Sequence, residues 1–118
     1  MPITIQRIYS KEDQPGIRIL VDRLWPRGIS KADARLFAWF RDVAPSDELR
    51  REFSHMAEKF GIFREKYLAE LRNNPDFQKL LEICRNSDVV LLYSASDTGH
   101  NNAVVLKEAL EKELGPVE

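Results

Sequence analysis

Residues 89–102 read Val-Val-Leu-Leu-Tyr-Ser-Ala-Ser-Asp-Thr-Gly-His-Asn-Asn, and this stretch decides the fold. Its first five residues, 89–93, are apolar on both sides of a pleated strand, which is typical of a central strand covered by helices on both faces. A helix is predicted over about 101–114, where apolar residues recur at helical spacing. The stretch therefore predicts a buried strand whose carboxyl end continues through a polar loop into a helix.

Two further strands are predicted closer to the N-terminus. Residues 3–8 alternate apolar and polar side chains, and residues 17–24 have a β-branched apolar centre. The turn residues Gln14-Pro15-Gly16 separate them. The stretch 36–43 fits either a strand or a continued helix, and its alternation favours the strand.

Capping residues predict the remaining helices. Ser30 and the acidic residue three positions later resemble a capping box, which predicts a short helix. Helices are also expected over about 46–55 and 59–73, and Asn74-Pro75 begins another. With no internal repeat or linker, residues 1–118 are expected to form a single small α/β domain with a short mixed, mainly parallel sheet flanked by helices.

Length and composition exclude several classes of protein. A chain of 118 residues with 43% hydrophobic and 31% charged residues is large enough to bury a core without a disulfide or a metal. The single cysteine, Cys84, excludes an intramolecular disulfide and every CxxC motif, and it suits a reducing compartment. No secretion signal and no apolar run of membrane-spanning length is present. We therefore expect a cytoplasmic protein with no membrane partner.

The charges cancel overall but are unevenly distributed. The chain has 18 basic and 19 acidic residues, which disfavours a broad electrostatic surface for nucleic acid. Residues 17–41, however, contain six basic residues, five of them arginines, against two acidic ones. This segment is either a solvated basic face or an anion site, since the arginine fork suits phosphate and carboxylate groups.

The first candidate site is the exit of the second predicted strand, residues 22–28, Asp-Arg-Leu-Trp-Pro-Arg-Gly. In open α/β sheets, ligands bind beyond the carboxyl ends of the strands. Arg23 and Arg27 would lie at that edge. The alternative is that Asp22 forms a structural ion pair with an arginine and Trp25 only packs.

The second candidate site is the loop from Tyr93 to Asn102. Small polar residues, a glycine and a helix start can hold an anion through backbone N–H groups and the helix dipole. Ser94 emerges from the strand, Asp97 or Thr98 could cap the helix, and His100 is expected in its first turn. Because both candidate segments follow parallel strands, they should face one another. Plain helix capping explains the same residues.

Other site types are poorly supported. Neither a phosphate loop nor a dinucleotide fingerprint is present. A triad of Ser94, His100 and Asp97 lacks the GxSxG turn, and a metal site using His55 and His100 would require distant segments to meet. Cys84 lies on the apolar face of its helix and is expected to pack. We therefore predict no metal site and no cofactor.

The leading hypothesis is a small anionic ligand, phosphate- or nucleotide-like, bound between the two segments. Arg23 and Arg27 would neutralise it, and Asn101 with the helix N-terminal amides would orient it. Trp25 and Ser94 would complete the binding site. Neither segment indicates an oligomeric state.

If a reaction follows binding, His100, Asp97 and Asp22 are the candidate proton-transfer groups. His100 is preferred because a histidine can hold or release a proton near neutral pH. The sequence does not decide whether the protein catalyses a reaction. The alternative is a non-catalytic module whose Arg/Trp face of residues 17–41 contacts nucleic acid or a protein, which the balanced charge does not favour.

Three strings carry a family resemblance: 21–28 (VDRLWPRG), 42–50 (DVAPSDELR) and 91–97 (LLYSASD). Across nearly the full chain the sequence resembles the YeaO-like family of uncharacterised bacterial and archaeal proteins, a domain of unknown function. The resemblance implies one small α/β domain and no established activity. Related branches carry a cysteine at the end of the last strand and a Cys-His-Arg beyond it, where this sequence has Tyr93-Ser94 and His100-Asn101. A thiolate mechanism is therefore not carried over from those branches to this sequence.

Overall fold

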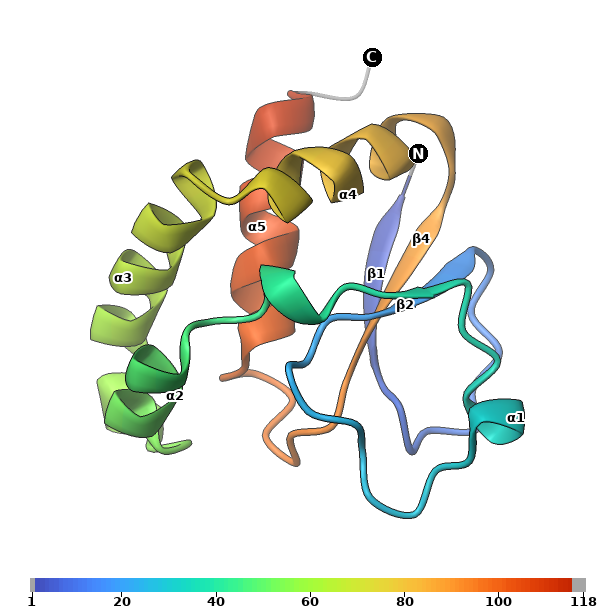
Figure 1. Ribbon diagram of the computed structural model, residues 1–118, viewed down its shortest axis with the longest axis horizontal. Helices are drawn as coiled ribbons and strands as arrows, with labels where there is room; N and C mark the ends of the chain where they lie inside the picture. Colours follow the sequence, from blue (N-terminus) through green and yellow to red (C-terminus); the bar gives the residue numbers. More distant parts are fainter. Residues whose placement is uncertain (1, 116–118) are drawn as a thin grey trace.

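The computed structural model describes residues 2–115, and they form a four-stranded sheet flanked by helices (Figure 1). The strands are β1 (Ile3–Arg7), β2 (Ile17–Leu20), β3 (Ala38–Trp39) and β4 (Val89–Tyr93). Their order is β1-β4-β2-β3, and every neighbouring pair is parallel. The α/β class is confirmed, but the sheet is not mixed, because no antiparallel pair occurs within the described residues.

Five α-helices and two short 3₁₀ turns complete the described chain. They are α1 (Lys31–Ala34), η1 (Arg41–Val43), α2 (Asp47–Phe53), η2 (Ala57–Lys59), α3 (Phe60–Arg72), α4 (Pro75–Asn86) and α5 (Asn102–Leu114). The side chains of Ser30, Ser46 and Asn74 accept hydrogen bonds from first-turn N–H groups of α1, α2 and α4, as their sequence positions predict.

The predicted bounds of α5, about 101–114, are confirmed, but its predicted capping residue is wrong. Its N-cap is Asn101, whose side chain accepts from the Val104 N–H, and not Asp97 or Thr98. His100 consequently lies before the helix and not in its first turn. The reason is that Asp97 uses its carboxylate within its own loop, which leaves Asn101 as the nearest residue able to cap α5.

Two strand predictions extend too far. Only Ala38–Trp39 of the 36–43 stretch pairs with β2, because the chain then tightens into η1 and buries Val43. β2 ends at Leu20, before the predicted residue 24. Beyond it, the backbone carbonyl of Asp22 accepts from the Trp39 indole at 2.6 Å, so a side chain takes the place of strand pairing.

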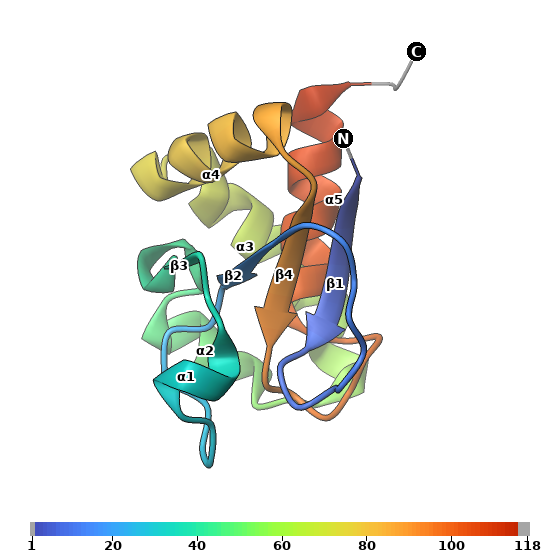
Figure 2. The same ribbon diagram turned by 90° about the vertical axis from the view of Figure 1, so that its right-hand side faces the viewer.

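β4 is buried along its whole length, and its alternate residues serve two separate cores. Val89, Leu91 and Tyr93 join the larger core, to which α2–α5 contribute. Val90 and Leu92 join a smaller core on the other face. That face is covered by residues 25–39, including the four-residue α1, and not by long helices as expected (Figure 2).

Gly16 marks the close approach of the β1–β2 connection to the start of β4. Its φ is +128°, and a Cβ placed there would lie 2.9 Å from the Asp88 carbonyl oxygen. The same oxygen accepts a hydrogen bond from the Ile17 N–H at 2.9 Å, which begins the pairing of β2 with β4. A side chain at residue 16 would therefore disturb the alignment of the central strands.

Tyr67 joins α3 to η1 inside the larger core. Its hydroxyl donates to the Val43 carbonyl at 2.6 Å, and the residue is 1% exposed. Burial raises the pKa of the Tyr67 phenol well above its ordinary range, with the nearby Glu70 carboxylate adding to the effect. The neutral phenol is thus the form that the fold stabilises.

Replacing Gly16 with alanine (Gly16→Ala) should lower the free energy of unfolding by about 1–3 kcal/mol, since it combines an unfavourable φ with a clash. Gly28→Ala is the matched control. It also has a positive φ, +76°, but its Cβ would meet no atom within 4 Å. Urea denaturation should show the smaller loss for Gly28→Ala. Equal losses would mean that the approach to Asp88 does not matter.

Tyr67→Phe should lower the free energy of unfolding by about 1–2 kcal/mol at neutral pH, because a buried carbonyl loses its donor. The unfolded phenol ionises near pH 10, below the folded pKa, so wild-type stability should fall as pH rises above about 10. Denaturation at several alkaline pH values should show a shallower decline for the variant. Tyr9→Phe, at an exposed hydroxyl, is the control. Parallel declines for wild type and Tyr67→Phe would contradict this role.

Candidate ligand pocket

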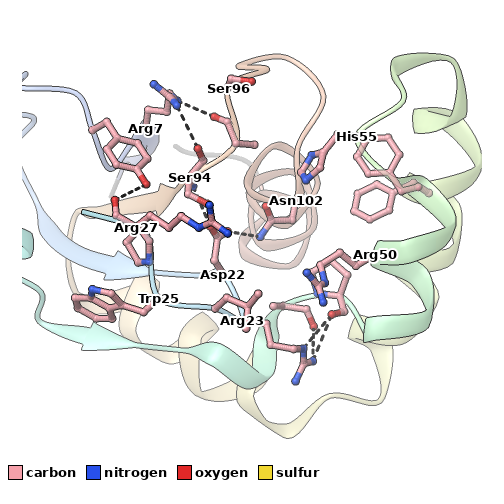
Figure 3. A pocket seen from close by; sticks show the side chains of 18 residues that line it. Arg7, Asp22, Arg23, Trp25, Arg27, Arg50, His55, Ser94, Ser96 and Asn102 are labelled. Atoms are coloured by element: carbon pink, nitrogen blue, oxygen red, sulfur yellow. Dashed lines mark hydrogen bonds between the residues drawn. The ribbon is translucent and has the colours of Figure 1, made fainter. Parts of the chain in front are cut away.

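A cavity of about 500 Å³ lies where β1, β4 and β2 end (Figure 3). Because these strands are parallel, their carboxyl ends lie at one edge of the sheet. One wall comes from residues that follow the strands and from the start of α5: Arg7, Tyr9, residues 22–27, residues 94–96 and Asn102. The other wall comes from the segment around α2 and from α3: Ala44, Pro45, Arg50, Phe53, His55 and Phe63.

Asp22 ties the strand ends together. One carboxylate oxygen accepts from the Ser94 backbone N–H at 2.9 Å and from the Ser94 hydroxyl at 2.7 Å. The other accepts from the Asn102 side-chain amide at 3.2 Å, and the same amide donates to the Val21 carbonyl at 3.0 Å. The two segments singled out in the sequence therefore meet, and a hydrogen-bonded carboxylate joins them.

Arg23 lines the cavity but is engaged with its own chain. Its guanidinium donates to the carbonyls of Ala44 and Pro45 at 3.3 Å, and it lies 3.8 Å from the carboxylates of Asp42 and Asp47. Figure 3 shows it pointing to the α2 side, away from the centre of the cavity. The arginine that forms structural ion pairs in this segment is thus Arg23. Its partners are Asp42 and Asp47, and both ion pairs are long.

Arg27 is the arginine that reaches the centre of the cavity. Its backbone carbonyl accepts from the Tyr9 hydroxyl at 2.9 Å, which fixes the main chain there. Its side chain extends toward Ser94 and Asn102 (Figure 3). Within residues 2–115, its guanidinium makes no hydrogen bond and no ion pair by the usual distance criteria. Arg27 is exposed, and its five donors are free to meet a ligand or water.

Arg7, at the end of β1, is a lining residue that the sequence reasoning missed. Its Nε donates to the Ala95 carbonyl at 2.8 Å and its Nη2 to the Ser94 carbonyl at 3.4 Å, and the guanidinium lies 4.9 Å from the Tyr9 ring centre. The sequence did contain a signal for placing Arg7 at this site. A residue ending a third parallel strand belongs at the same sheet edge as Asp22 and Ser94.

The α2 wall was also missed, although the string 42–50 that carries the family resemblance contains three of its residues, Ala44, Pro45 and Arg50. Ser54 and His55 follow the helix with φ values of +48° and +56°, an unusual pair of left-handed non-glycine residues. This turn places His55 against the cavity, with its ring 5.9 Å from the Phe53 ring. Arg50 also lines this wall and pairs with Asp47 at 3.2 Å.

Trp25 belongs both to the cavity and to the smaller core. Its indole N–H donates to the Ile29 carbonyl at 2.7 Å, and its ring meets the Trp39 ring edge-on at 5.4 Å. These contacts hold the 22–29 loop against the sheet. Trp25 therefore packs, as the alternative interpretation expects, and also contributes an apolar surface to the cavity.

The loop before α5 is held by its own hydrogen bonds. The Asp97 carboxylate accepts from the N–H groups of Gly99 and His100 at 2.9 and 3.0 Å, and the His100 ring lies 3.0 Å from it. The hydrogen bond from Gly99, with those from His100, lowers the pKa of Asp97. Asn101 caps α5 and donates to the Asp97 carbonyl at 2.9 Å. None of Asp97, His100 and Asn101 is among the residues that line the cavity.

Several other groups considered in the sequence make contacts within the fold. Arg18 donates to the Ala34 carbonyl at 3.0 Å, and burial lowers the pKa of its guanidinium. Arg41 lies 5.2 Å from the centre of the Trp39 ring. Together with Arg23, these residues use much of the basic segment 17–41 for internal contacts.

Cys84 is buried in the larger core, and burial raises the pKa of its thiol to about 11. It therefore packs, as predicted, and stays a thiol near neutral pH. Within residues 2–115, no three potential metal-ligating side chains come together. In the same residues, no helix is long and apolar enough to cross a bilayer.

The comparisons with known proteins agree on one family. A sequence model described as "Inactive DUF488-N3 subclade" matches residues 2–118. The chain is 44% identical over 112 residues to the uncharacterised protein YeaO of Escherichia coli K12, covering 93% of this chain and 97% of YeaO. It is 36% identical over 109 residues to Rv3073c of Mycobacterium tuberculosis H37Rv and to Mb3100c of Mycobacterium bovis, with 92% of each chain covered.

No solved structure matches the chain. The family match spans the strand exits, the cavity and the helices described above, and the relatives are covered over nearly their whole length. The resemblance to YeaO-like proteins is thus confirmed, and this chain belongs to the family described as "Inactive DUF488-N3 subclade".

Proposed function

We propose that the cavity at the strand ends binds a small anionic ligand and does not transform it. The observation that carries the proposal is the Arg27 guanidinium, which faces the cavity with no carboxylate partner among residues 2–115. An arginine that presents its planar donor fork into a concave site matches phosphate and carboxylate groups.

The charges around the cavity support an anion. Four arginines line it against one aspartate, which already accepts three hydrogen bonds from Ser94 and Asn102. Two of the four arginines are paired with carboxylates beside the cavity, so the positive excess rests on the other two. Arg7 adds a second positive charge near Arg27, on the strand-end wall. A ligand anion would therefore meet a local positive excess, even though the chain as a whole has a net charge of −1.

The surroundings of the predicted proton-transfer groups favour a protein that binds its ligand without catalysing a reaction. Asp97 and His100 are paired with one another outside the lining residues, and Asp22 is occupied in joining the strand ends. The description of the subclade as inactive agrees with this. The internal contacts of Arg18, Arg23 and Arg41 also favour a focused pocket over a nucleic-acid face.

Arg27→Ala should weaken binding of inorganic phosphate by at least about tenfold, because a charge-assisted hydrogen bond is worth roughly 1.5–3 kcal/mol. The measurement is an NMR titration that follows the backbone amides of Ser94 and Ser96. Arg51→Ala is the matched control, since it removes one exposed arginine of α2 that does not line the cavity. Equal weakening by both variants, or no phosphate binding by the wild type, would contradict the proposal.

The Asp22→Asn variant tests whether the Asp22 carboxylate stabilises the fold or takes part in a reaction. We expect the free energy of unfolding to fall by about 1–3 kcal/mol, because charge-assisted hydrogen bonds from Ser94 weaken. Phosphate affinity should stay the same or rise, since a negative charge has left the cavity. Asp42→Asn, at an exposed carboxylate, should change neither quantity appreciably. Unchanged stability with reduced affinity would contradict the structural role.

A further inference from the structure

We propose that the ligand is an organic anion, with a compact anionic group at Arg27 and an apolar body against the remaining walls. This inference rests on the proposed function and specifies the chemical class of its ligand. It follows from the size of the cavity, from the apolar side chains around it and from the placement of its charges.

The cavity is larger than an inorganic anion requires. A volume of about 500 Å³ falls within the range of roughly 300–1,000 Å³ found for pockets that hold small organic molecules. A tetrahedral inorganic anion has only five heavy atoms. It would occupy the region around Arg27 and leave the rest of the cavity to water.

The lining away from the arginines is largely apolar. Phe53 and Phe63 stack with their ring centres 4.4 Å apart and form a buried, well-packed part of the α2–α3 wall. Pro45 and Trp25 add further apolar surface. Leu24 also lines the cavity and is 59% exposed, so a large apolar side chain stands beside the site without a partner in the core. Covering such surface with an apolar ligand group is favourable.

The arginines that have no carboxylate partner within residues 2–115 lie on one side of the cavity, since Arg50 on the α2 wall is paired with Asp47. Arg7 and Arg27 lie on the strand-end wall, whereas Phe53 and His55 lie on the α2 side across the cavity (Figure 3). A ligand that satisfies both must carry its charge at one end. An anion with about one ring attached fits this division, and a uniformly charged ligand does not.

The experiment compares inorganic phosphate, phenyl phosphate, benzoate and neutral benzyl alcohol by calorimetric titration of the full chain. Phenyl phosphate should bind roughly ten- to a hundredfold more tightly than inorganic phosphate, as expected for burying one ring. Arg27→Ala should weaken both phosphate compounds. Whichever of phenyl phosphate and benzoate binds more tightly identifies the anionic group, and either result supports the inference.

Leu24→Ser tests the apolar body directly. It should weaken phenyl phosphate binding several-fold and leave inorganic phosphate unchanged, because only the ring would contact Leu24. Ile62→Ser is the matched control, since Ile62 is 61% exposed but does not line this cavity. It should leave both affinities unchanged.

The outcomes distinguish the organic-anion inference from the proposed function on which it rests. Equal affinities for inorganic and phenyl phosphate, both dependent on Arg27, would overturn the organic-anion inference and leave the anion site standing. Failure of every anion to bind would overturn the proposed function. Benzyl alcohol binding as tightly as phenyl phosphate would overturn both, because the charge would then contribute nothing.

Discussion

The arrangement of the pocket depends on the carboxylate of Asp22. Parallel strands deliver their carboxyl ends to one edge, but the loops beyond them are free to diverge. Asp22 prevents this by accepting from Ser94 and Asn102, and so it connects the exit of β2 to the exit of β4 and to the start of α5. The cavity is therefore built around a carboxylate that the fold itself uses, and the Arg27 guanidinium is left without a partner among residues 2–115.

The division of the arginines follows from that arrangement. Arginines at neighbouring positions of one loop have different surroundings: Arg23 meets the carbonyls of Ala44 and Pro45, and Arg27 meets none. Arg7 has an intermediate role, because it fixes the Ser94–Ala95 backbone while lining the cavity. A positively charged segment in a sequence thus contains both arginines that contact their own chain and arginines that stay without such a partner, and only their surroundings distinguish them.

The sequence predicted the central strand and the helix caps well, because both depend on local patterns. Val89–Tyr93 is apolar at every position, and Ser30, Ser46 and Asn74 precede recognisable helical runs. The prediction failed where distant contacts decide the local structure. The α5 cap depends on how Asp97 is used, and the contribution of His55 depends on a left-handed turn that no residue type announces. The orientation of Arg23 could not be predicted, since its partners lie about twenty residues away.

The strand order also constrains how the protein is made. β4 is the last strand in sequence, yet it lies between β1 and β2, so that Ile3 and Ile17 both pair beside Val89. While the chain is being synthesised, β1 has no strand partner until residues 89–93 leave the ribosome, and β2 has only the two-residue β3. Such long-range pairing slows folding, and unpaired strand edges promote association between chains. The nascent chain therefore exposes an edge of β1 and of β2 until β4 is made, and this is when chaperones would protect it.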